Sequence, residues 1–445
     1  MTRYPLFSGQ RLVWTALAAY SLGMLDSSPR VAVAAFIPYH LSILQNPSSS
    51  RSTVLFAKAA KNKKKGGKSG GAVAAGGIKG FGAAKISATS GDAVETDRSQ
   101  SARRFYEYLE QQDAGDNLKK CALGFFPLSN DDTKLRGVVA LRDIQKGEAI
   151  INIPYELAVN LGQEGGDPTL PAVELLKDYC QVMQSTDNNN NNQRKAYYDM
   201  LPPFRGNDCL GSTDFFSDEA LEALQAPLVV EETLKRRERT KRRFEQEISA
   251  ATETNTNNFP LWVDGSPVTQ EHLQWAVWLI TSRVLTVQGD AEEGRSYRLL
   301  IPFLDMCNHD RKSPHVLSGR AVPSGELKVV AGAAVKAGEQ INICYGGGVA
   351  GNDRFLQDYG FLDSDVGAFE MVAQQILGKR RILEGAGAGA FIKEADKEAT
   401  LKKLRSTTME EDRALLASTT DNAMRSAIEF RLAVKKALSK QIVMQ

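Results

Sequence analysis

The 445-residue sequence predicts an α+β protein in which short β-strands are split by a helical insert and followed by a helical C-terminal region. Short apolar runs between turn residues predict the strands, of which Val138–Leu141 and Ala149–Ile153 come first. From about residue 155 to 270 the pattern is helical and loop-rich, and residues 364–445 again show helical spacing. We therefore expect two regions after the N-terminal tail: residues 99–363, which contain the insert, and a C-terminal helical domain at 364–445.

Local periodicity predicts each element of this body. A first helix is expected around Phe105, Tyr108 and Leu109, which are at helical spacing. In the insert, residues 228–249 predict a solvated helix with opposite charges four residues apart, and Glu271–Leu285 predict an apolar helix. Further strands are expected at Leu299–Phe303, Leu327–Ala331 and Gln340–Cys344. The final helix should bury an apolar stripe made of Met424, Ala427, Ile428, Leu432, Val434 and Leu438.

The first 98 residues have the composition of a targeting region. Two arginines precede an apolar run, Leu12–Leu25, in the order of a secretory signal, and the run is short for a membrane-spanning helix. Residues 27–91 contain ten basic residues and no acidic one, as in a transit peptide. The junction Ala35-Phe36-Ile37-Pro38 resembles a phenylalanine-centred plastid cleavage motif.

We therefore expect residues 1–35 to act as a signal peptide and residues 36–98 as a transit peptide or unstructured segment. Together they would direct the protein to a plastid and leave no stable membrane anchor in the mature form. A mitochondrial or cytoplasmic location, with the region as a plain unstructured tail, is the alternative.

Charge is distributed unevenly along the chain. Residues 1–91 hold twelve Lys and Arg and a single acid, so the remaining 43 basic and 52 acidic residues carry a net charge of about −9. An acidic body argues against a general nucleic-acid-binding protein. The five cysteines are an odd number without a CxxC pair, which argues against a structural zinc site or a disulfide framework.

Three segments place chemically versatile residues where short strands begin or end. They are Lys134–Ala140, Pro302–His309, and Ile341–Gly346 with its continuation through Asn352 to Phe361. Singly, each has an ordinary structural explanation, such as a cap or a turn. A metal site built from Asp305, His309 and His315 is a less favoured hypothesis, because the chain has only four histidines.

Together and in this order, the segments resemble the SET-domain methyltransferases, and in particular the branch typified by the Rubisco large-subunit lysine methyltransferase. The resemblance runs from about Arg103 to the C-terminus, and its motifs are specific as a set: Asp-x-x-Asn-His, Tyr-Gly and a later Tyr-Gly-Phe. It implies a SET fold of short knotted β-strands with a helical insert, followed by a helical substrate-binding-like domain. It also implies S-adenosyl-L-methionine as the cofactor and a lysine side chain of another protein as the methyl acceptor.

The resemblance also assigns a cofactor-binding set. Main-chain atoms of the first segment would face the cofactor at Lys134, Leu135 and Arg136, although the family usually has a glycine where this chain has Leu135. Arg283 would bind the methionine carboxylate through a charge-assisted hydrogen bond. The amino group and the adenine side would be held through main-chain and amide contacts of Asn308 and His309.

The same resemblance assigns a lysine channel. Tyr345 matches the catalytic tyrosine and also borders the cofactor, while Tyr359 matches a second channel tyrosine. Phe361 would form an aromatic wall, and Asp305 would lie near the target lysine. A channel arginine of the plastid enzyme corresponds to Val287 here, so the acceptor protein does not follow from the resemblance.

Methyl transfer to lysine requires a neutral amine in a dry site, which an apolar aromatic channel favours by desolvation. The expected partners are protein substrates, with the Rubisco large subunit or another plastid enzyme as candidates, and the protein is expected to be a monomer. Two other functions fit the same residues. One is methylation of a protein histidine, and the other is a non-catalytic SET-like scaffold that binds partners through its C-terminal helices.

Overall fold

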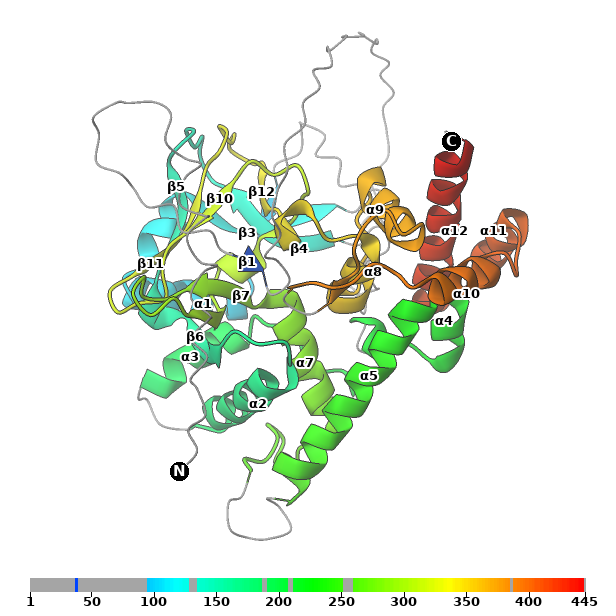
Figure 1. The fold of residues 1–445 in the computed structure, drawn as a ribbon. Coiled ribbons are helices and arrows are strands. Elements are labelled where there is room, and N and C mark those ends of the chain that lie inside the picture. The colour runs from blue at the N-terminus through cyan, green and yellow to red at the C-terminus, as the bar shows by residue number, and fades with distance from the viewer. Residues whose placement is uncertain are drawn as a thin grey trace, which may run out of the picture. The chain divides into compact units, whose positions relative to one another are not determined.

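The computed structural model describes residues 37–38, 94–127, 134–185, 190–206, 211–250, 259–384 and 387–443. The predicted signal peptide, and all of the predicted transit segment except residues 37–38 and 94–98, lie outside these residues. The described chain combines short strands in several small sheets with helices, so the α+β prediction is confirmed (Figure 1). Within the described part of the chain, no helix is long and apolar enough to cross a bilayer.

The largest sheet has five strands in the order β2-β3-β4-β12-β9. Its strands are β2 (Glu95–Thr96), β3 (Cys121–Pro127), β4 (Lys134–Ala140), β12 (Gln340–Ile343) and β9 (Asn308–His309). Strand β12 is antiparallel to β4, with Gln340 opposite Val139, and parallel to β9, with Asn342 opposite Asn308. The three segments singled out in the sequence are therefore neighbours in one sheet.

Two further sheets complete the strand-rich part. One has the order β10-β11-β5 and the other β1-β7-β8-β6, and a separate hairpin joins β13 and β14. Their bounds are β5 (Ala149–Pro154), β10 (Val316–Ser318), β11 (Glu326–Val330), β1 (Ile37–Pro38), β6 (Val159–Gln163), β7 (Leu285–Gln288), β8 (Ser296–Leu300), β13 (Leu383–Glu384) and β14 (Gly387–Ala388). The insert, predicted as helical and loop-rich, also contains the strand β6, which pairs with β8 across more than 130 residues.

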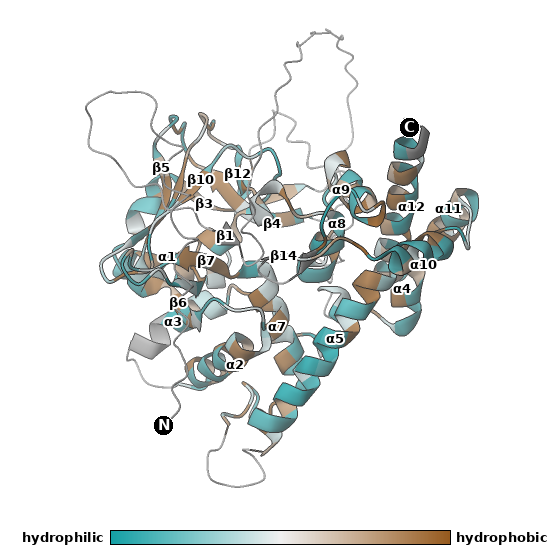
Figure 2. Ribbon diagram, viewed as in Figure 1, coloured by the Kyte–Doolittle hydropathy of each residue, from teal (hydrophilic) through white to brown (hydrophobic). Residues whose placement is uncertain are grey.

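The helices of the body follow the apolar periodicity of the sequence. They are α1 (Gln100–Gln111), α2 (Thr169–Gln184), α3 (Asn190–Tyr198), α4 (Asp218–Ala223), α5 (Pro227–Phe244) and α7 (Gln270–Arg283). Helix α1 begins where the Ser99 side chain accepts the Ala102 N–H, and it buries Phe105, Tyr108 and Leu109 as predicted. Helix α5 is largely hydrophilic along its length, whereas the strands and α7 are more apolar (Figure 2).

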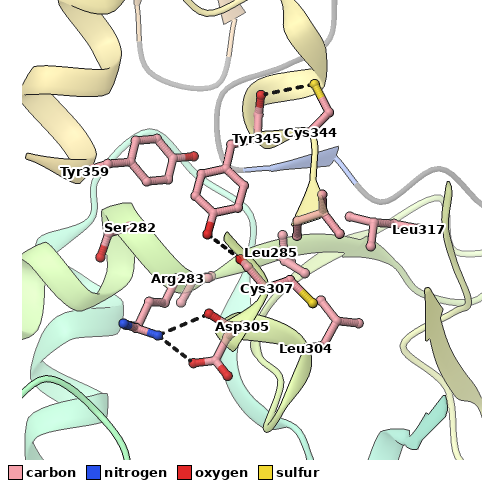
Figure 3. Close-up of a pocket in the computed structure, with 12 residues that line it drawn as sticks. Ser282, Arg283, Leu285, Leu304, Asp305, Cys307, Leu317, Cys344, Tyr345 and Tyr359 are labelled. Carbon is pink, nitrogen blue, oxygen red and sulfur yellow. Dashed lines mark hydrogen bonds and ion pairs between the residues drawn. The ribbon is translucent and has the colours of Figure 1, made fainter. Parts of the chain in front are cut away.

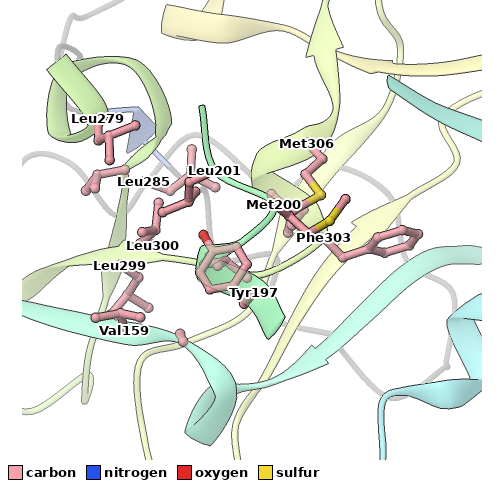
Figure 4. Close-up of a cluster of buried hydrophobic side chains, with 14 of the residues drawn as sticks. Val159, Tyr197, Met200, Leu201, Leu279, Leu285, Leu299, Leu300, Phe303 and Met306 are labelled. Atoms are coloured by element: carbon pink, nitrogen blue, oxygen red, sulfur yellow. The ribbon is translucent and has the colours of Figure 1, made fainter. Parts of the chain in front are cut away.

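The main hydrophobic core joins the sheets to helices of the insert. Figure 4 shows Tyr197 of α3 and Val159 of β6 packed near Leu299 and Leu300 of β8, with Leu279 of α7 in the same cluster. Four of these side chains are fully buried: Tyr197, Leu279, Leu299 and Leu300. The insert therefore helps to build the core that supports the strands.

A second core unites the insert with the C-terminal helices. These helices are α8 (Asn352–Arg354), α9 (Val366–Ile376), α10 (Glu394–Leu404), α11 (Met409–Ser418) and α12 (Asn422–Val443). Leu224, just after α4, belongs to the same buried cluster as Val372 of α9 and Phe430 of α12. Of the predicted apolar stripe, Ala427, Ile428, Val434 and Leu438 are buried. Helices α10, α11 and α12 lie together beside one end of α5 (Figure 1).

Candidate active site

The sheet register brings the predicted site residues together around one small pocket. Arg283, Asp305, Tyr345 and Tyr359 all line it (Figure 3). Arg283 ends α7, Asp305 lies in a 3₁₀ turn (Leu304–Met306) before β9, and Tyr345 follows β12. Phe303, just before that turn, is buried at φ 69°, a backbone conformation that is costly for a bulky residue and that sets the direction of the turn.

Tyr345 is anchored at both ends. Its backbone N–H donates to Nδ1 of His309 at 3.0 Å. Its hydroxyl donates to the Cys307 carbonyl at 2.5 Å, as Figure 3 shows. Burial raises the pKa of the Tyr345 hydroxyl, so the group stays protonated at neutral pH. Because the neutral hydroxyl uses its proton in the hydrogen bond to the carbonyl, its oxygen lone pairs can accept a hydrogen bond from a partner in the pocket.

Aromatic rings surround Tyr345. The Tyr359 ring stacks on it with centroids 5.1 Å apart, and the His309 ring lies 5.1 Å away on a tilted plane. Phe361 packs edge-on against Tyr345 at 6.5 Å and against Tyr359 at 5.9 Å. Burial also raises the pKa of Tyr359. The arrangement is an apolar, aromatic-walled site with neutral hydroxyls, although Phe361 does not itself line the pocket.

Asp305 is held by two polar partners at the pocket. Arg283 donates through Nη1 to the Asp305 carbonyl at 3.1 Å and to its carboxylate at 3.4 Å, and the Tyr197 hydroxyl donates to the same carboxylate at 3.0 Å. Burial raises the pKa of Asp305, and this effect outweighs the lowering by Arg283 and Tyr197. Nε of Arg283 and Oδ1 of Asp305 are buried without a hydrogen-bond partner among the described residues.

Strand β4 and Asn308 form an adjoining surface. Nδ2 of Asn308 donates to the Arg136 carbonyl at 3.0 Å, so the two predicted cofactor segments are in contact. Burial and the nearby Arg283 guanidinium lower the pKa of Arg136. Lys134 forms a 2.6 Å ion pair with Glu95 and is half exposed, so its side chain is turned to the surface and only its main chain can serve a ligand.

No metal site accompanies these residues. Among the residues that the structure describes, no group of three or more His, Cys, Asp or Glu side chains could hold an ion. Nε2 of His309 instead lies 3.3 Å from Asp363, and Asp305 is engaged by Arg283 and Tyr197.

One known family accounts for the three motif segments. Residues 135–346 match the family model described as SET domain. The chain contains a SET domain. All three motif segments fall within or directly beside this match.

Curated relatives of this SET-domain chain are plant proteins. It is 25% identical over 238 residues to the ribulose-1,5 bisphosphate carboxylase/oxygenase large subunit N-methyltransferase, chloroplastic, of Nicotiana tabacum. It is 28% identical over 242 residues to the [fructose-bisphosphate aldolase]-lysine N-methyltransferase, chloroplastic, of Arabidopsis thaliana. The matches cover 51% and 52% of this chain, and they span less than half of the relatives, 45% and 46%.

Solved structures confirm the SET fold. The SET domain of LSMT bound to lysine and AdoHcy superposes with a TM-score of 0.51 at 17% identity, covering 77% of this chain and 90% of that one. Rubisco LSMT bound to AdoMet gives a TM-score of 0.50 at 16% identity, covering 78% and 91%. At this identity the likeness shows the shared fold.

Several residues of the SET-domain site were not among those predicted from the sequence. Tyr197 reaches Asp305 from α3, 108 residues away along the chain. Ser282 and Cys344 line the pocket, and each is adjacent to a predicted site residue, so proximity in sequence could have indicated them. The Cys307 carbonyl, which accepts the Tyr345 hydroxyl, is a main-chain group and leaves no trace in residue type.

Proposed function

We propose that this protein is an S-adenosyl-L-methionine-dependent protein-lysine N-methyltransferase. The observation that carries the proposal is the pairing of Tyr345 with Tyr359 in a pocket that Arg283 also lines. The SET fold and the lysine methyltransferase relatives support it. The site residues named below are proposals for this chain.

The residues around Arg283 fit a ligand that carries a carboxylate. Arg136 and Arg283 lie close enough for one guanidinium to lower the pKa of the other. Arg283 pairs with the Asp305 carboxylate at 3.4 Å. Nε of Arg283 is buried without a partner among the described residues. A buried arginine donor stabilises a carboxylate strongly. Arg283 would therefore hold the methionine carboxylate of the cofactor. Asn308 and the main chain of β4 would contact the remainder of the cofactor.

Bound S-adenosyl-L-methionine would supply an activated methyl group on a positively charged sulfur, so no nucleophile from the enzyme is needed. The tasks left to this chain are to bind, orient and dry the amine. The rings of Tyr345 and Tyr359 exclude water and disfavour the charged ammonium form. The Tyr345 hydroxyl, held through Cys307, would orient the neutral amine.

The acceptor class can be tested with labelled cofactor. Plastid extract incubated with the protein and labelled S-adenosyl-L-methionine should acquire label on lysine, identified by mass spectrometry of the modified peptides. Label on histidine would favour the histidine methyltransferase hypothesis instead. Absence of cofactor binding by calorimetry would leave the scaffold hypothesis in place.

Arg283→Ala and Asn308→Ala are expected to weaken cofactor binding. Each removes a polar partner of a charged ligand, and one such hydrogen bond is worth about 1.5–3 kcal/mol. Affinity measured by calorimetry should fall about tenfold or more. Arg295→Ala serves as the control, because Arg295 is more than half exposed and its only ion pair among the described residues is a 3.9 Å contact with Glu293. Unchanged affinity in folded Arg283→Ala protein would remove this arginine from the cofactor site.

We also propose a plastid location, supported by the acid-free segment at residues 27–91 and by the chloroplastic relatives. A fluorescent fusion of residues 1–95 should enter plastids and lose its N-terminal part on import. A matched fusion in which the basic residues of 58–68 are replaced by glutamate should be imported poorly. Cytosolic retention or secretion of the first fusion would rule out this targeting route.

A further inference from the structure

Arg311 and Asp363 form a buried ion pair next to the segment that carries Tyr345. Nε of Arg311 donates to Oδ2 of Asp363 at 2.7 Å, and the two side chains are 11% and 8% exposed. Burying two charges costs desolvation energy, so such a pair is weak evidence for stability alone. What the two side chains contact is more informative.

Hydrogen bonds to a buried side chain hold the Asp363 backbone in place. Its backbone N–H donates to the fully buried Asn352 side chain at 2.6 Å, and its carbonyl accepts the Asn352 amide at 2.9 Å. Burial would raise the pKa of the Asp363 carboxyl, but hydrogen bonds from His309, the Asp365 N–H and Arg311 outweigh burial and hold it at about 2. The carboxylate is therefore charged at every physiological pH.

Asp363 fixes the orientation of His309. The backbone N–H of Tyr345 can only donate, so Nδ1 of His309 must be the acceptor and the ring proton lies on Nε2. Nε2 is 3.3 Å from the Asp363 carboxylate, which accepts that proton. A carboxylate that receives the Nε2 proton holds the ring in the tautomer that Tyr345 requires.

Arg311 fixes the loop that follows Tyr345. Gly346, Gly347 and Gly348 have φ of 62°, 57° and 77°, and glycine backbone is costly to order. Arg311 donates through Nη1 to the Gly348 carbonyl and through Nη2 to the Ala350 carbonyl, both at 2.7 Å. Its guanidinium also lies 5.4 Å from the centroid of the Phe355 ring, in the same aromatic cluster as Tyr345.

We infer that Asp363 and Arg311 are positioning residues for Tyr345, one acting through His309 and the other through the glycine loop. The inference rests on the proposed methyltransferase function. Neither residue belongs to the pocket lining, so each acts on the tyrosine through its neighbours. Losing either should displace the Tyr345 hydroxyl without removing a contact to the cofactor.

Asp363→Asn tests the first half, because it keeps the shape and removes the charge. Single-turnover methyl transfer should fall at least about tenfold, within the scale expected when a reacting geometry is displaced. Cofactor affinity should stay within about twofold by calorimetry. In long-range ¹H–¹⁵N spectra, His309 should carry its proton on Nε2 in the wild type and show mixed tautomers in the variant, because the amide can also donate to Nε2. The chain has only four histidines, which makes the signal assignable.

Arg311→Lys tests the second half and stays informative if Asp363→Asn does not fold. Lysine keeps the charge, but it lacks the planar guanidinium that donates to the Gly348 and Ala350 carbonyls at the same time. Transfer should again fall at least about tenfold, while the His309 tautomer stays on Nε2. Lys312→Gln is the matched control, since it removes the neighbouring ion pair between Lys312 and Asp365, in which the lysine is 82% exposed. Its transfer rate and spectra should match the wild type.

Each variant tests whether the residue that it changes positions Tyr345. A folded variant that transfers methyl within about twofold of the wild type would overturn the role of that residue. So would a fall in rate that merely follows a matching loss of cofactor affinity or of melting temperature. If the wild type neither binds cofactor nor transfers methyl, the proposed function fails instead. The His309 tautomer would still report whether Asp363 orients the ring.

Discussion

Tyr345→Phe is expected to lower methyl transfer by about 10²-fold or more while leaving the fold intact. The variant loses one hydroxyl, and that hydroxyl is the group proposed to orient the amine in the transition state. The ring still stacks on Tyr359 at 5.1 Å, so the wall of the pocket remains. The lost hydrogen bond to Cys307 should cost about 1 kcal/mol of stability. Single-turnover methylation at saturating cofactor measures the effect.

Two further tyrosine variants serve as a control and a comparison for Tyr345→Phe. Tyr155→Phe removes a hydroxyl that accepts the Asn160 amide away from the pocket, and it should transfer methyl at the wild-type rate. Tyr359→Phe is expected to change how many methyl groups are added rather than to abolish transfer, because Tyr359 lines the pocket and its hydroxyl is proposed to face the lysine channel. A Tyr345→Phe enzyme within about threefold of the wild type would exclude this hydroxyl from the mechanism.

Elements with strong local periodicity could be predicted from the sequence. The helix expected at Glu271–Leu285 is α7, Gln270–Arg283, and the strand expected at Gln340–Cys344 is β12, Gln340–Ile343. Their apolar spacing and turn residues act over a few positions, so no distant partner is needed to specify them. The end of the charged helix predicted at 228–249 differs in detail, because its last turn, Glu245–Ser249, is a π-helix.

Contacts between distant segments could not be predicted in this way. Strand β3 was missed because its residues Cys121–Pro127 are continuously apolar and include a glycine. The five residues of β6 do alternate between buried and exposed, but the run is short and lies in a region whose wider pattern is helical and loop-rich. Both are defined by pairing, with β4 and β8 respectively. The same holds at the site, where the motifs indicate Tyr345 and His309 but not Asp363, whose role depends on a contact 54 residues away.

Arg236 illustrates how such a distant contact supports the site. This arginine of α5 is 5% exposed and forms 2.7 Å ion pairs with Asp214 and with Asp358, whose side chains are 3% and 0% exposed. It also donates to the Gln357 carbonyl at 2.5 Å. Burial lowers the pKa of Arg236, but the two carboxylates outweigh burial and raise it, so the guanidinium stays charged. Asp358 directly precedes Tyr359, so this network helps to hold the segment that carries the proposed second channel tyrosine.

Arg236→Ala is expected to lower the free energy of unfolding by about 3–5 kcal/mol, because it removes a charge that two buried carboxylates share. Asp358 keeps its ion pair with Arg354, so Asp214 loses more. Arg242→Ala is the matched control on the same helix. Its ion pair with Glu238 is 3.4 Å long with both side chains more than half exposed, and such pairs contribute about 0–1 kcal/mol. Urea denaturation followed by circular dichroism measures both variants. If the two lose equal stability, the buried network is no more important than the solvated face of α5. If Arg236→Ala is destabilised as expected, folded protein at low temperature should also show altered Tyr359 packing, because the contacts of Arg236 with Gln357 and Asp358 are lost.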